Sequence, residues 1–284
     1  MAIPRDDFEG KFQNHPSRLK KILPKFKLKS SLSLQNMNLS HISVSETGLK
    51  RSNNEDAVIF VEPDKPWLTQ SMGVLAVVSD GMGGYERGEK ASAMVVDVLN
   101  KSYYRELGQP QENLRKAAIE VNNAVAIESK ISGQKMGATC TALVICDDQL
   151  HFLHIGDSRA YIYSGDELQQ CTSDHTAANE LAHSQAMRHS DQTMIFNPHA
   201  LTKAMGMKFS HECQADVFSL KNNLQKGDRI LLCSDGLYIH VNDEDLRMAL
   251  EPKKSLKQVA DQLVKWIMKR GALDNFTFLL IDFN

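Results

Sequence analysis

The chain has 284 residues, of which 42% are hydrophobic, and a formal net charge of −2. This length and composition suit a globular core of one large domain or two small ones, which excludes a fibrous or wholly disordered protein. No apolar run approaches the ~18 residues of a membrane helix, and the start lacks the apolar centre of a signal peptide, so we expect a cytoplasmic protein without a transmembrane segment.

Charge is unevenly distributed along the chain. Residues 1–38 carry eight Lys and Arg against three Asp and Glu, whereas the remainder carries 25 and 32. A nucleic-acid-binding domain would carry its excess positive charge on the folded part, whereas here the positive charge lies in the N-terminal segment and the remainder is acidic. No nucleic-acid partner is therefore expected. Three prolines interrupt the basic segment, which favours an N-terminal extension (1–38) before one domain (39–284). Its stretch 19–29 could contact an acidic partner or a membrane surface, or remain a solvated tail.

Two strands are predicted at the start of the domain. Residues 39–45 alternate between polar and apolar side chains, as in a half-buried strand, and residues 57–61 form a second strand. Their connection carries Arg51, Glu55 and Asp56. Taken alone, such a connection would be a surface turn of mixed charge.

The strand predicted next, from residue 74 to 78, is an unbroken apolar run that we expect to be buried on both faces. The prediction places Asp80 at the end of this strand, where Gly81, Gly83 and Gly84 follow. Glycines there let the backbone come close to a bound group. A carboxylate beside an exposed backbone carbonyl suits a hard cation.

The middle of the chain predicts two amphipathic helices, 86–100 and 112–131, that form a layer on a sheet. Four short strands linked by polar turns follow, and we interpret them as an antiparallel meander: 138–146, 150–155, 159–163 and 167–171. This order disfavours a doubly wound nucleotide-binding fold, and neither GxGxxG nor GxxxxGK[ST] occurs.

Residues 172–205 are polar and contain His175, His183, His189 and His199. Because their spacing matches no paired zinc-binding face, we interpret the segment as a flap beside the site, with a zinc site as the alternative. The five cysteines include no CxxC pair and lie mostly in apolar runs, which favours reduced core residues. None is followed by Arg six positions later, which argues against a cysteine-nucleophile phosphatase.

The C-terminal part again contains an apolar strand followed by an Asp-Gly pair, as at Asp80 and Gly81. An apolar strand beginning at residue 229 ends in Asp235 and Gly236, a helix is predicted over 255–269, and Asp274 precedes a last strand over 276–281.

Three strand ends therefore carry Asp80, Asp235 and Asp274. Carboxylates in such positions are costly to desolvate unless a cation binds them. The simplest explanation for all three is that they bind the same divalent metal centre. Oxygen ligands select Mg²⁺ or Mn²⁺ over zinc or copper. Taken one at a time, each Asp-Gly pair would be a plain turn.

In this order, the motifs resemble those of the metal-dependent serine/threonine phosphatases of the PP2C (PPM) family, and most closely its bacterial branch. The resemblance covers about residue 40 to the C-terminus. The motifs that carry it are Arg51-x-x-Asn54-Glu55-Asp56, Ser79-Asp80-Gly81-Met82-Gly83-Gly84, Gly88-Glu89-x-Ala91-Ser92, Met136-Gly137-Ala138-Thr139, Gly156-Asp157-Ser158-Arg159-Ala160-Tyr161, Asp174-His175, Leu201-Thr202-x-Ala204-x-Gly206, Gly227-Asp228, Ser234-Asp235-Gly236-Leu237 and Asp274-Asn275.

The resemblance implies an α+β fold, a four-layer α-β-β-α sandwich in which helix pairs flank two mostly antiparallel sheets, and a centre with two Mn²⁺ or Mg²⁺ ions. Asp80 would bridge both ions. Glu55 and the Gly81 carbonyl would complete one ion's ligands, and Asp235 and Asp274 would hold the other. Asp56 would act on metal-bound water from the outer shell, and Arg51 would bind the substrate phosphate.

The chemistry implied by the resemblance is direct attack of a metal-bridging hydroxide on phosphorus, without a phosphoenzyme. Two positions depart from the family pattern. Met82 stands where some relatives carry a histidine proposed as proton donor, so the leaving group takes its proton from water or elsewhere. Ile239 stands where many bacterial members have an Asp that holds a third metal with the equivalent of Asp157, so a third ion should bind weakly or not at all.

The main hypothesis is thus a phosphatase acting on phosphoserine and phosphothreonine in proteins, with a cognate Ser/Thr kinase implied. One alternative is a catalytically weak or inactive PP2C-like module that binds or regulates. Another is a two-metal hydrolase of small phosphate esters, which would share the metal centre and differ in what the flap admits.

Overall fold

The computed structural model describes residues 39–83, 87–183, 197, 199–207, 213–221 and 223–284. The predicted extension, 1–38, lies outside the described residues, as does Gly84, so the extension and its contacts stay predictions.

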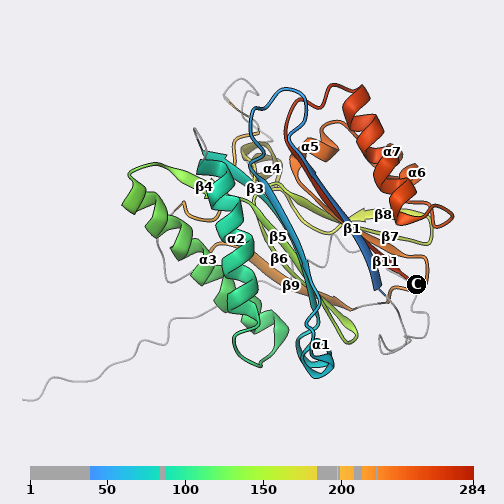
Figure 1. Ribbon diagram of the computed structural model, residues 1–284, viewed down its shortest axis with the longest axis horizontal. Helices are drawn as coiled ribbons and strands as arrows, with labels where there is room; N and C mark the ends of the chain where they lie inside the picture. Colours follow the sequence, from blue (N-terminus) through green and yellow to red (C-terminus); the bar gives the residue numbers. More distant parts are fainter. Residues whose placement is uncertain (1–38, 84–86, 184–196, 198, 208–212, 222) are drawn as a thin grey trace, which may run out of the picture. The chain divides into compact units, whose positions relative to one another are not determined.

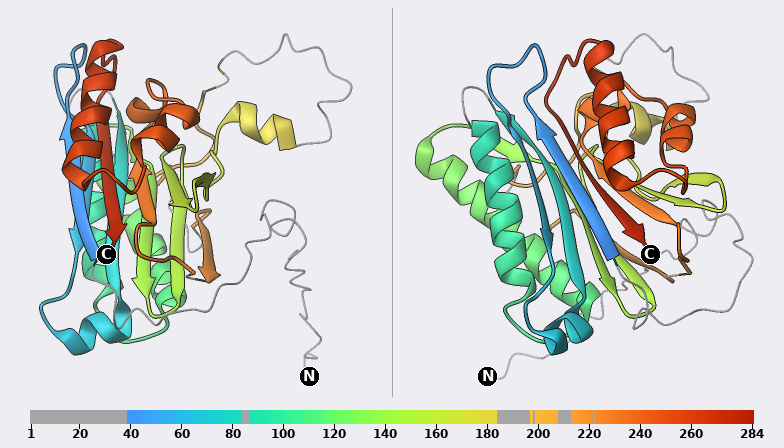
Figure 2. Two further views of the ribbon diagram at one scale, coloured as in Figure 1. Left: turned by 90° about the vertical axis from the view of Figure 1, so that its right-hand side faces the viewer. Right: turned by 45° about the vertical axis from the view of Figure 1, so that its right-hand side comes forward.

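Two antiparallel sheets form the centre of the domain (Figures 1 and 2). The first has the order β1-β11-β10-β7-β8, with β1 Leu39–Glu46, β7 Arg159–Ser164, β8 Glu167–Gln170, β10 Arg229–Cys233 and β11 Phe276–Phe283. The second has the order β2-β3-β5-β6-β9, and β4 pairs with the end of β3; these strands are β2 Asp56–Val61, β3 Val74–Gly83, β4 Met136–Ala138, β5 Cys140–Cys146, β6 Gln149–Ile155 and β9 Asp216–Lys221.

The sheets pack face to face through apolar side chains. Val78, Leu143 and Phe152 of the second sheet belong to one buried cluster with Leu232 and Leu279 of the first. Every second residue of these strands therefore faces an apolar interior, which explains the apolar runs in the sequence.

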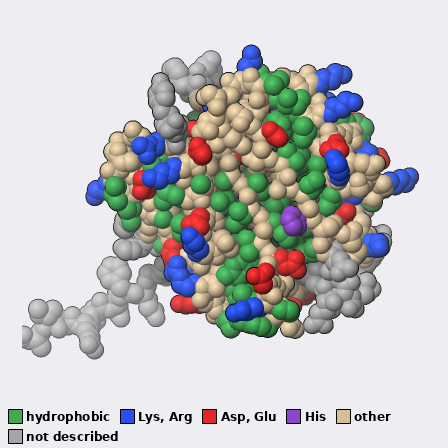
Figure 3. Space-filling model, in the orientation of Figure 1, with side chains coloured by type: hydrophobic (Ala, Val, Ile, Leu, Met, Phe, Trp, Pro, Cys, Tyr) green, Lys and Arg blue, Asp and Glu red, His purple; other side chains and the backbone are tan. Residues whose placement is uncertain are grey.

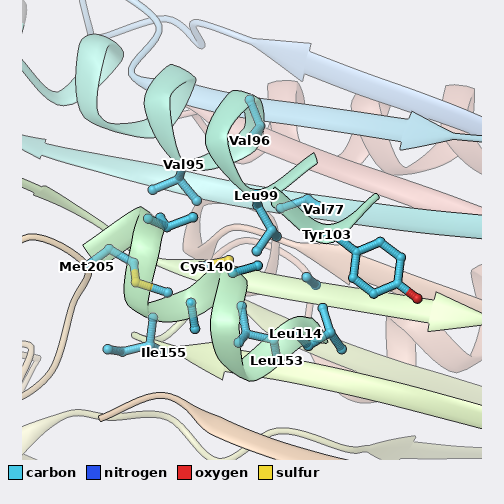
Figure 4. Close-up of a cluster of buried hydrophobic side chains, with 14 of the residues drawn as sticks. Val77, Val95, Val96, Leu99, Tyr103, Leu114, Cys140, Leu153, Ile155 and Met205 are labelled. Carbon is cyan, nitrogen blue, oxygen red and sulfur yellow. The ribbon is translucent and has the colours of Figure 1, made fainter. Parts of the chain in front are cut away.

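Helices cover the outer face of each sheet. The pair α2 Arg87–Tyr103 and α3 Pro110–Ser132 packs on the second sheet, and Figure 4 shows side chains such as Leu99 and Leu114 among Val77 and Leu153 of the strands. The pair α6 Asp243–Ala249 and α7 Leu256–Lys269 packs on the first sheet. The predicted four-layer α+β sandwich is thus confirmed. None of the described helices is long and apolar enough to cross a membrane.

The predicted meander of four strands is wrong. β5 and β6 pair within the second sheet, whereas β7 and β8 pair within the first, so the chain changes sheets between Ile155 and Arg159. Gly156 makes this change possible with a φ of +107° and a backbone so close to Thr139 that an added Cβ would lie 2.5 Å from its Cγ2. The short polar link looks like a hairpin turn in sequence, but its backbone leads away from β6.

The remaining helices are short: α1 Pro66–Met72, α4 Ala177–His183 and α5 Asp235–Tyr238. The sequence patterns above predict none of α1, α4, α5, α6 and β9. All five cysteines are free, and Cys140, Cys146 and Cys233 are buried. On the face shown in Figure 3, basic side chains are interspersed with acidic ones among the described residues.

Candidate functional site

One pocket brings together most of the predicted site residues. It has a volume of about 330 Å³, and seven of the eight residues predicted to carry the chemistry line it, with Asp56 as the exception. The lining residues are Arg51, Glu55, Asp80, Gly81, Met82, Thr139, Asp157, His199, Leu201, Asp235, Asp274 and Asn275.

The pairing of β2 with β3 sets one side of this pocket. Asp56 lies opposite Asp80 in the antiparallel register, and the Gly81 N–H donates to the Glu55 carbonyl oxygen over 3.0 Å. A side chain at position 81 would collide with the Gly88 carbonyl and lie 2.6 Å from the Glu55 oxygen. Gly81 is therefore required by close backbone packing, which places Glu55 beside Asp80.

The first sheet contributes the other side. Asp235 begins α5, one residue after β10 ends, and Asp274 precedes β11. Asn275 fixes the junction, because its Nδ2 donates to the carbonyls of Thr47 (2.9 Å) and Asn53 (2.8 Å) while its Oδ1 accepts from the Glu55 N–H (2.9 Å). In the sequence Asn275 stands out only as part of a motif; the structure makes it a positioning residue that joins the β1–β2 connection to β11.

Asp56 lies behind the pocket, where it links the two sheets. Its Oδ2 accepts a hydrogen bond from the Ser234 hydroxyl over 2.7 Å, and the residue is only 9% exposed. Its Oδ1 has no hydrogen-bond partner among the described residues. A buried carboxylate oxygen without a partner is unfavourable, so this position is stabilised when positive charge lies nearby.

The acidic groups strongly oppose one another's ionisation. Burial, followed by repulsion from Asp56 and Asp235, holds the pKa of Asp80 well above its ordinary value of 3.8. Burial and then repulsion from Asp235 raise the pKa of Asp157 to about 7. Burial also raises the pKa of Asp235, with Asp274 as the next cause. The carboxylates thus form a centre of excess negative charge that a bound cation would relieve.

Arg51 is the basic side chain at this centre. Its Nη2 lies 2.6 Å from Asp274 Oδ2, and the side chain is 53% exposed. In the described part of the chain, no group of three or more Asp, Glu, His or Cys side chains is arranged to hold a metal ion, and Asp274 is engaged by Arg51 instead. The donor set nevertheless consists of oxygens alone and fits a hard divalent cation.

Asp157 lies at one edge of the pocket on the turn between the sheets. The Tyr238 hydroxyl donates to its backbone carbonyl over 3.1 Å, and the Arg159 guanidinium lies 3.6 Å from the centre of the Tyr238 ring. Arg159 also binds Asp174 through two nitrogens, at 3.0 and 2.7 Å. These contacts give the turn a structural support of its own, and a role for Asp157 toward a third metal stays a prediction.

Two of the four histidines noted in the sequence have described side chains near this region. The Gly156 N–H donates to His175 Nδ1 over 3.1 Å, so His175 supports the turn that carries Asp157. His199 lines the pocket together with Leu201. The predicted flap falls partly on residues 184–196, which include His189 and lie outside the described residues, and it stays a prediction.

Comparison with known proteins supplies relatives over most of the chain. A family model described as protein phosphatase 2C matches residues 50–277. Serine/threonine phosphatase stp of Listeria innocua is 29% identical over 248 residues, which cover 84% of this chain and 94% of that protein. Serine/threonine protein phosphatase PstP of Mycobacterium tuberculosis is 31% identical over 253 residues, 86% of this chain and 45% of that protein. A solved PstP catalytic domain in complex with two manganese ions has a TM-score of 0.71 at 30% identity and covers 87% of this chain and 99% of that one.

Proposed function

Because the chain belongs to the protein phosphatase 2C family, we propose that it is a metal-dependent phosphatase that removes phosphate from phosphoserine and phosphothreonine in proteins. The observation that carries the proposal is the pocket itself, in which Glu55, Asp80 and Asp235 gather beside the half-exposed Arg51. A phosphoprotein substrate implies a Ser/Thr kinase that produces it.

The metal ligands proposed are Asp80 for both ions, Glu55 and the Gly81 carbonyl for one, and Asp235 and Asp274 for the other. Two Mn²⁺ ions are present in the solved PstP domain, and either Mn²⁺ or Mg²⁺ suits these oxygen donors. When bound, the ions would supply positive charge for the phosphoryl oxygens and acidify water in the pocket.

The protein's own residues orient the reaction. Arg51 offers a planar guanidinium that suits two phosphoryl oxygens, once a phosphate and a metal take over its present contact with Asp274. Asp56 is held in place by Ser234 and can accept a proton at its unpaired Oδ1. Met82 carries no proton to donate, so the leaving oxygen must be protonated from another residue or from water.

The Asp235→Asn variant tests the proposed function. Purified wild-type protein is expected to release phosphate from a phosphothreonine peptide when Mn²⁺ is present, and Asp235→Asn to lose at least about 10²-fold in kcat, because one metal then loses a charged ligand. If wild type and variant release phosphate equally, the centre is not where the chemistry occurs.

Two other functions give different results in the same assay. A folded wild-type protein that remains silent with Mn²⁺ and with Mg²⁺ would be a binding or regulatory module. Hydrolysis of nucleotides in preference to the phosphopeptide would indicate a phosphatase of small esters. The presence of all four carboxylates at the pocket, Glu55, Asp80, Asp235 and Asp274, supports the phosphatase of proteins over an inactive module.

His199 is the proposed source of the leaving-group proton, since it is the only imidazole among the described residues that line the pocket. The variant His199→Gln is expected to lower kcat on a phosphothreonine peptide by about 10²-fold, because an alkoxide is a poor leaving group without a proton. The same variant should hydrolyse p-nitrophenyl phosphate at close to the wild-type rate, because nitrophenolate leaves without protonation. Equal losses on both substrates would contradict a role in proton transfer.

A matched control is His41→Gln. His41 is exposed on β1, where its ring stacks on Phe60 with centroids 3.8 Å apart, and it does not line the pocket. Its replacement should leave both rates unchanged.

A further inference from the structure

Three large apolar side chains lie exposed on segments that also carry residues of the pocket. Leu49, Ile239 and Leu273 are 58%, 54% and 55% exposed, and we call them together the apolar rim. Each follows or precedes a site residue closely in the chain: Leu49 comes two residues before Arg51, Leu273 directly before Asp274, and Ile239 directly after α5, which Asp235 begins.

Two hydrogen bonds, one between backbone groups and one to a histidine side chain, join the segments that carry the apolar rim. The Leu49 N–H donates to the Ala272 carbonyl over 2.9 Å, and the Leu273 N–H donates to His240 Nε2 over 3.3 Å. The three segments therefore lie side by side, with 271–274 in the middle. Figure 1 shows the β1–β2 and α7–β11 connections at the same end of the molecule. The rim is accordingly one surface contributed by three loops.

The backbone under the rim is closely packed. Ala272 is completely buried, and Gly48 packs so closely that an added Cβ would lie 2.7 Å from the Ala272 carbonyl oxygen. Asn275 ties the same loops together through Thr47 and Asn53. A preformed surface binds a partner without first having to be ordered, which favours a binding role over incidental exposure.

Single exposed apolar residues need no explanation, and the chain has others, such as Leu107 at 63% exposure. The apolar rim differs because its three segments also carry Arg51, Asp235 and Asp274, which line the pocket. A phosphate held at Arg51 would fix the phosphorylated residue there, and the adjacent residue of the same peptide would lie within about 3.5 Å of chain length. The side chains that flank the phosphorylated residue are therefore the part of a substrate that can reach the segments carrying the rim.

We propose that the apolar rim selects phosphoprotein substrates in which an apolar side chain flanks the phosphorylated residue. This inference rests on the proposed function and specifies its substrate class. Burial of an aliphatic side chain against the apolar rim favours such a substrate, because it removes apolar area from water.

Selectivity between two peptides tests the proposal. The peptides differ only at the residues on either side of phosphothreonine, which are Leu in one and Asp in the other, and kcat/KM is measured for each with Mn²⁺. Wild type is expected to prefer the Leu peptide by about tenfold or more, and Leu49→Ser and Leu273→Ser each to lower that ratio by about threefold to tenfold. The variant Leu107→Ser, a matched exposed leucine away from the pocket, should keep the wild-type ratio.

The outcomes separate this inference from the proposed function. Equal hydrolysis of both peptides by wild type would overturn the rim's role while the phosphatase activity stands. Hydrolysis of neither peptide would contradict both the proposed function and the role of the rim. A wild-type preference that survives in the rim variants would show that another surface selects the substrate. If sedimentation shows that the rim variants dissociate a wild-type dimer while the ratio stays constant, the rim is a contact between two copies, and the proposal is wrong.

Discussion

Replacing Asp56 by asparagine is expected to stabilise the metal-free protein and to impair catalysis. Burial is the main cause that raises the pKa of Asp56, and its Oδ1 has no hydrogen-bond partner in the described structure. An amide keeps an acceptor for the Ser234 hydroxyl, removes the buried charge and offers a donor toward the neighbouring carboxylates. We expect a gain of about 2 kcal/mol in the free energy of unfolding at mildly alkaline pH without metal, and a loss of about 10- to 100-fold in kcat with Mn²⁺.

The pH dependence has a definite sign. Because the folded-state pKa of Asp56 lies above the unfolded value, its contribution to stability is fully present below the unfolded pKa and is lost as the pH rises through the folded pKa. The advantage of Asp56→Asn should therefore be largest in alkaline solution and vanish in acid. Urea unfolding in EDTA across this range measures it. Asp97→Asn, an exposed residue of α2 paired with Lys101, serves as the control and should change stability by less than about 0.5 kcal/mol. A wild-type protein more stable than Asp56→Asn in alkaline EDTA would contradict the account.

Replacing Arg229 by alanine is expected to lower the free energy of unfolding by about 3–5 kcal/mol. The side chain is 1% exposed and donates to the carbonyls of Leu250 (3.3 Å), Glu251 (3.0 Å) and Lys254, while its Nε lies 3.3 Å from Asp282 Oδ1. Alanine would leave these carbonyls and the mostly buried carboxylate of Asp282 without their donor. Urea unfolding of the metal-free protein is the measurement.

Two variants separate the network of Arg229 from a general effect of lost charge. Arg229→Lys keeps the charge but cannot reach several acceptors, so it should fall between wild type and alanine. Arg105→Ala removes an exposed pair with Glu120, 2.8 Å long, and should cost less than about 1 kcal/mol. A cost for Arg229→Ala no larger than that of Arg105→Ala would show that the buried network contributes little.

The sequence predicted the parts of the site that depend on buried strands. Apolar runs identify β3 and β10, but Asp80 does not lie at the tip of its strand as predicted, because β3 continues to Gly83 by pairing with β4. Asp235 follows the end of β10 at Cys233, and the meeting of the two acids in the pocket follows from the fold that the motifs implied. The family resemblance read from those motifs is confirmed by the match to residues 50–277. The roles assigned to the individual carboxylates stay predictions.

Other features depend on contacts that no local pattern reveals. The change of sheet at Gly156 requires a backbone conformation with positive φ, and a polar turn in sequence does not distinguish it from a hairpin. β9 is an edge strand that pairs with β6 alone, so its weak pattern gave no prediction. The pairing of Arg51 with Asp274 joins residues far apart in the chain.

Two of the missed helices did have local signals. Pro66 begins α1 and Gly73 follows it, the usual asymmetry of helix ends. Asn242 caps α6 by accepting a hydrogen bond from the Asp245 N–H over 2.9 Å. Both helices have only seven residues, too few to show an amphipathic period.

Phosphate release from a phosphothreonine peptide, followed as Mn²⁺ is titrated into metal-free wild-type protein, tests the proposal that the acidic pocket works as a metal-dependent phosphatase. We predict no release in EDTA, a rise with Mn²⁺ to a plateau, and restoration by Mn²⁺ after chelation. Release that is equally fast in EDTA, or its absence at every Mn²⁺ concentration from protein shown to be folded, would contradict the claim.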